Sequence, residues 1–528
     1  EMKGSMTSIP RRRFDYVVAN PPYISYNECS KQGLLVFDLI KKKQVQLSDV
    51  FGVNLHSIPN NRKKYAPKPN LYAFFIALGL ALLKDDGRLC YIIPQTILTA
   101  GDLDVLRYHL AKYRTIERII TFNSNLFIER GLRQKRIIPT SSLILVVGKN
   151  APSKTHEVEV INYKGVEDTI KDTLNNIVKG KKTDTRKVKQ ADLLKNCANW
   201  NFIKHNKAFL DLYEEYKKRT DEISVYYQHA QAENQFGSRF YFDIGFILDL
   251  KAAIGNGNLD KFYELLDFKT FYGYSRFVPS AYYPKDRDKI ELTQNSQGYI
   301  TLDQRYKIVW RIKNPDRFCL TDHPIIFYMG KASIICSNNK SEVLYLFSLL
   351  NSFLSKLILQ ANIRSETEKE YLVPIKAIKE FVRVPKIIRD NQHIKDEIIQ
   401  RTEEMLALEE KTLSDFVDFS GVLMQKFDNV QVDGNTLVLV HDNQKTELQI
   451  KGDIGLIAST IAEEFGARGL KLEKRRISLS ELRNKQVIDF ERQAQLKDYI
   501  DDLVFALYFK IPLKEVSLDK AEEIRKDC

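Results

Sequence analysis

The sequence has few cysteines and no long apolar run. Its six cysteines are scattered over 528 residues without the paired spacing of a disulfide framework or a zinc site. No apolar stretch approaches the roughly 20 residues that a membrane helix needs. The first residues, EMKGSMTSIPRRR, lack the apolar core of a signal peptide. We therefore expect a cytoplasmic location, reduced thiols, no membrane partner and no bound metal.

Acidic residues are also in deficit. The chain has 81 Lys and Arg against 68 Asp and Glu, a formal net charge of +13. A basic excess of this size suits a polyanionic partner, because neutralised phosphates release counterions and so contribute affinity for any sequence. A protein that is merely basic would show the same charge, so both interpretations stay open.

The first 150 residues alternate between strand-like and helix-like segments. YVVA (16–19) is a short β-rich run that ends at a turn, and RLCYIIP, ending at Pro94, has the apolar run of a buried strand. IERIITF and SSLILVVGK are two more strand-like runs. Residues 71–83 have helical spacing that stops at Asp86-Gly87, and DVLRYHLAKY is amphipathic. This alternation predicts an α/β fold on a mainly parallel sheet.

The rest of the chain divides by composition. Residues 151–222 suggest a basic, partly helical connector, in which VKGKKTDTRKVKQ (178–190) has the composition of a solvated linker. Residues 223–385 are rich in aromatics and short β-like pieces. Residues 386–528 combine a helical spacer with a small α/β segment. We predict boundaries between domains at these positions, the first part being 1–150.

An unusual tetrapeptide follows the first predicted strand: FDYVVA leads into Asn20, Pro21, Pro22 and Tyr23. Proline fixes φ and removes a backbone N–H, so the nearby carbonyls can point into a cleft without a competing donor. The Asn20 side-chain oxygen and the Pro21 carbonyl can then accept both hydrogens of an –NH2 group and aim its lone pair at an electrophile. The Tyr23 ring offers a face for a planar base, worth about 1–3 kcal/mol. A proline-rich turn is the structural alternative.

These residues closely resemble motif IV of the amino-methyltransferases that use S-adenosylmethionine (SAM), where the pattern is Asn/Asp-Pro-Pro-aromatic. The segment NLYAFFIALGLALLKDDGRLCYIIPQTIL resembles the next two family motifs, in which a Leu-Tyr pair opens a helix beside cofactor and target base. The resemblance covers about residues 11–150. It is strongest to γ-class adenine-specific DNA methyltransferases of the type IIG restriction–modification and BREX-like groups.

This resemblance implies a partial Rossmann-like methyltransferase sheet followed by a β-rich target recognition domain and a helical C-terminal region. It also implies methyl transfer from SAM to the exocyclic amine of a flipped adenine, in a restriction–modification or phage-defence system. The implied catalytic residues are Asn20, Pro21, Pro22 and Tyr23, and the implied cofactor contacts are Asn20, Leu71 and Tyr72.

One part of the family pattern is missing from the sequence. The Gly-rich SAM loop and the acidic ribose ligand precede motif IV in this family, but the nineteen residues before Asn20 contain no G-x-G. We therefore expect the SAM loop on a separate polypeptide or on a segment outside this chain. This chain alone should bind SAM weakly.

The motif is shared with enzymes that methylate cytosine in DNA, guanine in ribosomal RNA or glutamine in release factors. The glutamine enzymes need nothing downstream, whereas nearly 380 residues follow the methylase strands here. A long basic, aromatic part suits recognition of double-stranded DNA, with phosphate contacts for register and side chains for base edges. An RNA or protein-glutamine methyltransferase and a non-catalytic DNA-binding specificity subunit stay open as alternatives.

Candidate DNA contacts lie among the aromatics of the predicted recognition domain. If FYGYSRF is a strand, Tyr272, Tyr274 and Arg276 share one face, where Arg276 could hold a guanine edge. Arg311 and Lys313 are further basic candidates. Packing in the domain core is an equally good interpretation of each aromatic.

A nuclease is a weaker alternative. The hairpin DGNTLVLVHDNQKTELQIK, with Asp433, Asp442, Glu447 and Lys451, loosely resembles a PD-(D/E)xK site, which would need Mg²⁺. Exposed polar residues on an edge hairpin explain the same pattern more simply. Methyl transfer itself needs no metal.

Overall fold

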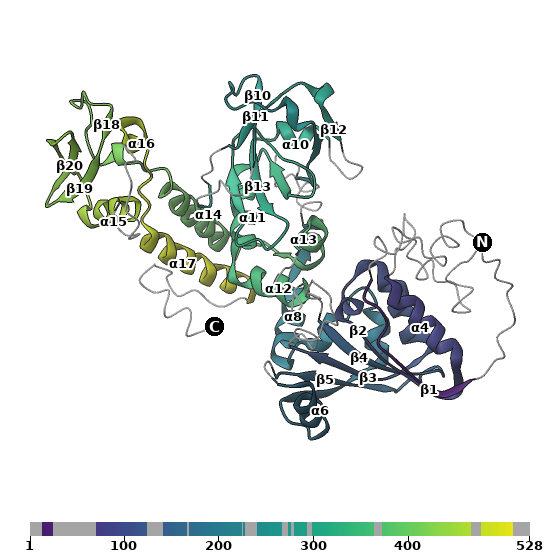
Figure 1. Ribbon diagram of the computed structural model, residues 1–528. Coiled ribbons are helices and arrows are strands. Elements are labelled where there is room, and N and C mark those ends of the chain that lie inside the picture. Colours follow the sequence, from purple (N-terminus) through teal and green to yellow (C-terminus); the bar gives the residue numbers. More distant parts are fainter. Residues whose placement is uncertain are drawn as a thin grey trace. The chain divides into compact units, whose positions relative to one another are not determined.

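The computed structural model describes residues 13–24, 70–123, 141–165, 168–223, 225–226, 240–266, 273–275, 279–292, 298–363, 372–465 and 477–509. Its internal contacts divide the chain into two units (Figure 1). Unit 1 comprises Glu1–Asp211 and Ala361–Tyr371, and unit 2 comprises Leu212–Gln360 and Leu372–Cys528. Unit 1 thus continues well past residue 150.

Unit 1 is built on a six-stranded sheet with strand order β1-β2-β4-β3-β5-β6. Its strands are β1 (Phe14–Ala19), β2 (Leu83–Pro94), β3 (Thr115–Phe122), β4 (Ser142–Gly148), β5 (Glu157–Tyr163) and β6 (Thr183–Lys189). The predicted α/β class is confirmed, but the prediction of a mainly parallel sheet is wrong, because three of the five strand pairs in this sheet are antiparallel. β1–β2 and β3–β5 are parallel, but β4 and β6 run antiparallel to their neighbours. Antiparallel neighbours need no crossover helix, so the order of elements along a sequence does not fix strand direction.

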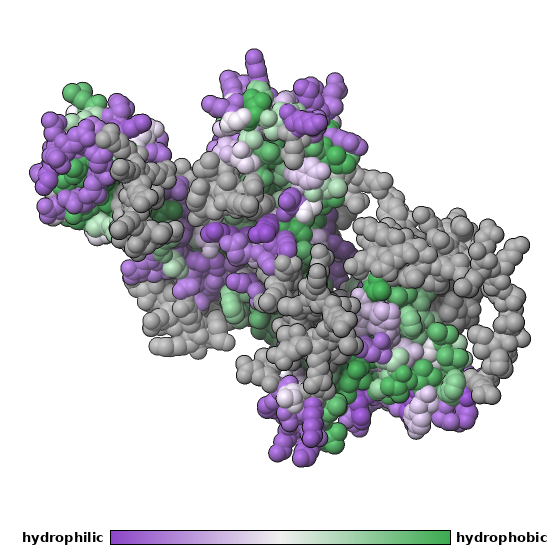
Figure 2. All heavy atoms as spheres, in the orientation of Figure 1, coloured by the Kyte–Doolittle hydropathy of each residue, from purple (hydrophilic) through white to green (hydrophobic). Residues whose placement is uncertain are grey.

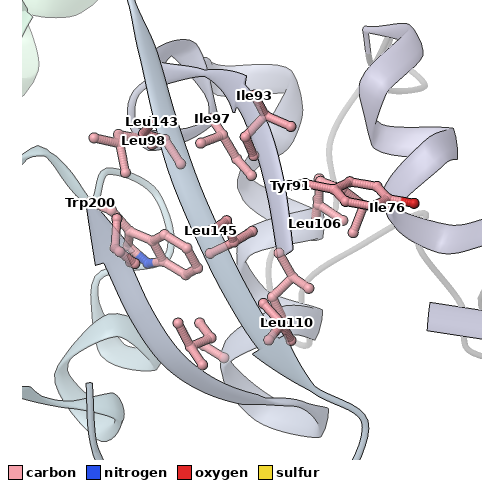
Figure 3. Packing of buried hydrophobic residues seen from close by; sticks show 14 of the residues in the cluster. Ile76, Tyr91, Ile93, Ile97, Leu98, Leu106, Leu110, Leu143, Leu145 and Trp200 are labelled. Carbon is pink, nitrogen blue, oxygen red and sulfur yellow. The ribbon is translucent and has the colours of Figure 1, made fainter. Parts of the chain in front are cut away.

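One face of this sheet is covered by α4 (Leu71–Leu82), α5 (Asp104–Tyr113) and α7 (Gln190–Lys195). Their apolar side chains form one core with Leu89, Tyr91 and Ile93 of β2 and with Trp200 (Figure 3). A smaller cluster joins Ile120 of β3 to Ile177 of α6 (Ile170–Val178). Since Ile119 belongs to the first cluster and Ile120 to the second, α6 lies on the opposite face.

Close packing of α4 on β2 explains the glycine at position 79. A Cβ on Gly79 would fall 2.3 Å from the Tyr91 hydroxyl oxygen and 2.6 Å from Cδ1 of Leu89. Neither approach is possible between real atoms without movement. Glycine therefore lets the helix lie directly against the strand.

Two local differences from the sequence predictions stand out in unit 1. The strand β2 begins at Leu83, so Asp86-Gly87 lies inside a strand and not at a helix end. The basic run 178–190, predicted as a linker, contains β6, whose residues from Thr185 to Lys189 alternate between exposed and half-buried. An edge strand covered only on one face lacks the apolar run by which a buried strand is recognised.

Unit 2 begins with small β-sheets of order β14-β13-β16-β8, β11-β10-β15 and β12-β9. Their strands are β8 (Tyr241–Asp243), β9 (Phe246–Leu248), β10 (Phe262–Leu265), β11 (Ala281–Pro284), β12 (Ile290–Leu292), β13 (Tyr306–Arg311), β14 (Cys319–Thr321), β15 (Ile325–Ile326) and β16 (Ala332–Ser337). A β-rich segment was predicted here. From Lys340 to Phe381 the described residues are mostly helical, with α11 (Lys340–Asn351), α12 (Phe353–Ile363) and α13 (Ile375–Phe381), so the recognition segment is less β-rich than predicted.

Two long helices follow, α14 (Gln392–Ala407) and α17 (Phe490–Phe509), in the part of the chain for which a helical spacer was predicted. Between them in sequence, the described residues of 413–465 and 477–487 form their own small core around the sheet β19-β20-β21 and α15. The bounds there are β18 (Lys426–Phe427), β19 (Asn429–Asp433), β20 (Thr436–His441), β21 (Gln444–Gln449), α15 (Ile454–Phe465), β22 (Ile477–Ser478) and α16 (Leu479–Arg483).

The remaining short elements are α8 (Lys207–Arg219), β7 (Thr220–Glu222), α10 (Ile300–Asp303) and β17 (Arg383–Pro385), which pairs with β7. No single described helix has the length and apolar composition of a membrane span. The bent pair α11 and α12 meets that test only when both helices are taken together.

Candidate active site

The Asn-Pro-Pro-Tyr motif lies where the parallel strands β1 and β2 of the unit 1 sheet end, which we call the carboxyl edge. It follows the last residue of β1, and the parallel strand β2 ends on the same edge at Pro94. Asn20 and Pro22 are exposed, Pro21 is buried and Tyr23 is half-buried. Ligands of open α/β sheets bind at this edge. The motif therefore occupies the position that the sequence predicted for it.

Tyr23 is held by the start of a distant strand. Its hydroxyl shares a hydrogen bond of 3.1 Å with the hydroxyl of Ser142, the first residue of β4. Burial raises the pKa of the Tyr23 phenol, and the hydrogen bond with Ser142 partly opposes that rise. The sequence predicts a role for the ring face of Tyr23 but gives no signal for the contact made by its hydroxyl.

The motif loop also meets the N-terminus of α4. The backbone N–H of Leu71 donates to the carbonyl of Ile24 at 3.0 Å, which satisfies one donor of the first helical turn. Leu71 and Tyr72 themselves point into the core, and Tyr72 has no exposed surface. The Tyr72 hydroxyl shares a hydrogen bond of 3.1 Å with Thr96, and burial raises the pKa of its phenol. A role for the Tyr72 side chain at a cofactor would therefore have to be indirect.

Gln95 joins three strand ends at this edge. Its side chain is 4% exposed, and its Nε2 donates to the carbonyls of Phe122 (2.9 Å) and Ser142 (3.0 Å). Its backbone N–H donates to Ser141, and its Oε1 accepts from Lys204 at 3.3 Å. The amide therefore ties the end of β3 and the start of β4 to the end of β2. A polar residue directly after the strand-ending Pro94 was the available signal in the sequence.

Arg107 fixes the loop that follows Gln95. This guanidinium has no exposed surface and donates to the carbonyls of Ile97, Ala100, Cys197 and Ala198. Four carbonyl acceptors compensate for the burial of the charge. The edge that carries the motif is thus stabilised by polar contacts from several segments of unit 1.

The predicted DNA contacts are only partly described. Tyr272 and Arg276 lie outside the described residues. Tyr274 is half-buried and its ring meets Phe347 of α11 edge-on, with centroids 6.1 Å apart, which matches the alternative of core packing. Arg311 and Lys313 are exposed at and just beyond the end of β13, where contact with phosphates stays a prediction.

Glu409 is a buried carboxylate that no pattern in the sequence singled out. It is fully buried just after α14 and accepts from the backbone N–H groups of Tyr274 (2.7 Å) and Ser275 (2.8 Å). The Ser275 hydroxyl and the Gln493 amide donate to it as well. Any side chain on Gly273 would collide with this carboxylate, so Gly273 is needed for the contact. The turn 273–275 is therefore fastened to the α14–α17 region.

The acidic hairpin does not bring its residues together. Asp433 pairs with Thr436 at one end of β20, whereas Asp442 follows His441 at the other end. A strand of this length spans roughly 17–20 Å. This separation favours the interpretation as exposed residues of an edge hairpin over a nuclease site.

Comparisons with known proteins find methylases similar to the part of the chain that contains the motif. Residues 6–127 match the model of the Eco57I restriction-modification methylase family. The chain is 32% identical over 103 residues to the type II methyltransferase M.TthHB8I of Thermus thermophilus. The matched region covers 20% of this chain and 21% of that protein. It is 22% identical over 413 residues to the type II methyltransferase M.HindII of Haemophilus influenzae, covering 77% of this chain and 67% of that protein.

The predicted resemblance to restriction–modification methylases is confirmed. The chain spans about a fifth of M.TthHB8I, as the alignment shows. Among solved structures, the type IIL restriction-modification enzyme MmeI in complex with DNA is similar at a TM-score of 0.45 and 10% identity, over 97% of this chain and 57% of that chain.

Proposed function

We propose that this chain contains the motif-bearing part of a site-specific DNA adenine methyltransferase of the γ class, within a restriction–modification or phage-defence system. The observation that carries the proposal is the position of Asn20–Tyr23. These residues follow β1 at the carboxyl edge of an α/β sheet, inside the segment that matches the methylase family.

The chemistry follows from the acceptors in the motif. The Asn20 Oδ1 and the Pro21 carbonyl accept the two N–H groups of the target amine, which concentrates electron density on its nitrogen. The Tyr23 ring stacks on the flipped base and holds the amine against these two acceptors. SAM, when bound, supplies the electrophilic methyl group. The exposed position of Asn20 leaves its amide accessible to a substrate.

The described residues do not form a complete SAM site by themselves. Leu71 and Tyr72 are core residues, and Asp15 on β1 is paired with Lys84 at 2.9 Å. We place the remaining part of the site at the outer side of β1, where no described strand pairs with it. Phe14, Tyr16 and Val18 are exposed there at 48%, 67% and 73%. Figure 2 shows apolar residues gathered over this part of unit 1.

DNA is the substrate that the rest of the chain favours. The basic excess of +13 supplies phosphate affinity, and the β-rich part of unit 2 offers exposed Arg311 and Lys313. We assign residues 223–385 to target recognition and 386–528 to a spacer and small C-terminal segment, whereas the predicted connector 151–222 supplies β5 and β6 to the unit 1 sheet. Double-stranded DNA and the polypeptide that completes the SAM site are the proposed partners.

The test is methyl transfer from radiolabelled SAM to DNA by the reconstituted enzyme. Asn20→Ala should lower transfer on the order of a hundredfold or more, as when one preorganised contact to a reacting group is removed. Salt-sensitive DNA binding should stay nearly unchanged. Asn123→Ala, at the end of β3 on the same edge, is the matched control and should transfer methyl groups normally.

Two results would contradict the proposal. Loss of DNA binding together with transfer in Asn20→Ala would make Asn20 a structural residue. DNA binding by the wild type without any transfer, in the presence of the completing polypeptide, would favour a specificity subunit.

A further inference from the structure

We propose that Ser142 and Gln95 are positioning residues that set the orientation of the Tyr23 ring at the carboxyl edge of the sheet. The inference rests on the proposed function, since it assigns these residues to the capture of a flipped base by Tyr23. It adds to that function two polar residues that lie far from the motif in sequence.

The Tyr23 ring is restrained at both ends. On the backbone side, Pro21 and Pro22 fix their own φ angles, which limits the directions in which the following side chain can leave. On the far side, the hydroxyl is 3.1 Å from Ser142 Oγ. A contact at the tip of a side chain with two rotatable bonds restricts the plane of the ring, and stacking depends on that plane.

Ser142 is a rigid anchor for this contact. It is 1% exposed, and as the first residue of β4 it pairs in register with Pro94 of β2. Its carbonyl accepts from Gln95 Nε2 at 3.0 Å. The hydroxyl that meets Tyr23 therefore belongs to a residue whose backbone is fixed on two sides.

Gln95 connects this anchor to the rest of the edge. Both N–H groups of its amide are used, on Phe122 and Ser142, and its oxygen accepts from Lys204. A buried amide with two donors and one acceptor engaged has one preferred orientation. Loss of this amide would leave the carbonyls of Phe122 and Ser142 without its two N–H donors, which loosens the residue that carries the hydroxyl next to Tyr23.

This network changes what is expected of Tyr23 variants. If only the ring face mattered, Tyr23→Phe would be nearly equivalent to wild type. With the hydroxyl restrained by Ser142, Tyr23→Phe keeps the ring but frees its orientation. Tyr23→Phe and Ser142→Ala should therefore have similar, intermediate effects, well below that of Tyr23→Ala.

The first measurement needs only this chain. It is labelled with 3-fluorotyrosine, and the Tyr23 signal in the fluorine NMR spectrum is identified by its loss in Tyr23→Phe. Ser142→Ala should shift this signal and raise the pKa of the Tyr23 phenol further, because the hydrogen bond with Ser142 lowers it. Ser333→Ala, the same change at a residue of unit 2 with no exposed surface, should leave the Tyr23 signal in place. An unchanged Tyr23 signal in Ser142→Ala would overturn the proposal.

The second measurement is a double-mutant cycle on single-turnover methyl transfer by the reconstituted enzyme. Ser142→Ala should slow transfer roughly two- to tenfold, the range set by one neutral hydrogen bond. DNA affinity should stay within about twofold of wild type, because phosphate contacts dominate affinity. The effect of Ser142→Ala should disappear in a Tyr23→Phe background, and Ser142→Thr should restore transfer.

The cycle separates positioning from general structure. An equal loss in the wild-type and Tyr23→Phe backgrounds, or the same loss from Ser333→Ala, would overturn the assignment. Gln95→Leu should slow transfer by a similar factor and depend on Tyr23 in the same way. If the wild type transfers no methyl group to DNA, the proposed function fails, while the NMR measurement still decides whether Ser142 orients Tyr23.

Discussion

The two edges of the unit 1 sheet differ in chemistry. The β6 edge exposes Thr185, Lys187 and Lys189. Lys187 Nζ forms an ion pair with Glu157 Oε2 at 3.8 Å. The β1 edge exposes Phe14, Tyr16 and Val18. Charged residues, especially lysine, protect an edge strand against pairing with another chain, whereas an apolar edge invites it. By this criterion the sheet formed by the described residues resists further strand pairing at β6 and favours it at β1.

The side chains of β1 also divide between the two faces. Val17 and Ala19 pack against the core under α4, beside Leu89 and Tyr91 of β2. Tyr16 and Val18 lie on the other face, beside Arg88 and Cys90. One face of β1 is therefore packed against a core, and its other face is apolar and exposed, as expected of a surface that another segment covers. This supports the proposal that the completing part of the SAM site, on a separate polypeptide or on a segment outside this chain, docks at β1.

The strongest test of this comparison is to give β1 the charges of β6. Tyr16→Lys with Val18→Lys should lower methyl transfer by the reconstituted enzyme at least tenfold, because desolvating two lysines opposes docking of the completing segment. The free energy of unfolding of this chain alone should change by about 0.5 kcal/mol or less, since both side chains are exposed.

Thr183→Lys with Thr185→Lys on β6 is the matched control and should transfer methyl groups as wild type does. Transfer by the β1 variant at the wild-type rate would show that β1 is not the docking edge. Analytical ultracentrifugation of each variant with the completing polypeptide would separate failed docking from failed chemistry.

A second test concerns the covered face of β1 and β2. Gly79→Ala should lower the free energy of unfolding by about 1–3 kcal/mol, because its Cβ would overlap Tyr91 and Leu89. A loss of stability would be informative, because helix propensity alone favours alanine over glycine by about 1 kcal/mol and would raise the free energy of unfolding. Urea unfolding of both proteins measures the difference.

Gly421→Ala is the control for this change, since no atom lies within 4 Å of the Cβ that it adds. A Gly79→Ala protein as stable as wild type would mean that α4 shifts away from β2 without cost. The close packing of α4 would then contribute little to the position of the motif.

The sequence predicted the elements that carry periodic apolar residues. The strand before Asn20, the helix from Leu71 and the strand ending at Pro94 were all located, because burial on one face leaves a regular pattern. β6 was missed because an edge strand with alternating lysines has the composition of a loop. The helix end near residue 83 was placed too late, since Asp86-Gly87 signals a turn in a helix and is also tolerated in an exposed strand end.

The candidate site was predicted only as far as the motif itself extends. Asn20 to Tyr23 form a rare combination that suggests its own chemistry. Ser142 and Gln95 are ordinary polar residues, and only the pairing of β2 with β4 brings them to Tyr23. Contacts of this kind depend on strand order, which local sequence does not determine.

The segment that supports β6 should lose stability in acid because it contains a buried histidine. His205 follows a short helical turn (Asn201–Lys204), and its Nε2 is buried without a hydrogen-bond partner in the described part of the chain. Burial, with the nearby charges of Lys204 and Arg186, lowers the pKa of His205 to about 4. Arg186 belongs to β6 and donates to the carbonyl of Phe202, so this histidine lies in the segment that supports the β6 edge.

Because the folded pKa of His205 lies below the unfolded value of about 6.5, the unfolded state binds more protons between these values, and stability falls as the pH falls through that window. Between about pH 7 and about pH 5.5, wild type should lose about 1 kcal/mol more of its free energy of unfolding than His205→Phe does. Urea unfolding in a Trp310→Phe background, followed by the fluorescence of the buried Trp200, measures this in unit 1. His323 in unit 2 has the opposite effect on the pH dependence of stability. Its hydrogen bond to Glu264 raises its pKa, so this contact contributes stability at lower pH. Equal acid sensitivity in wild type and His205→Phe would show that the β6 side does not depend on a neutral His205.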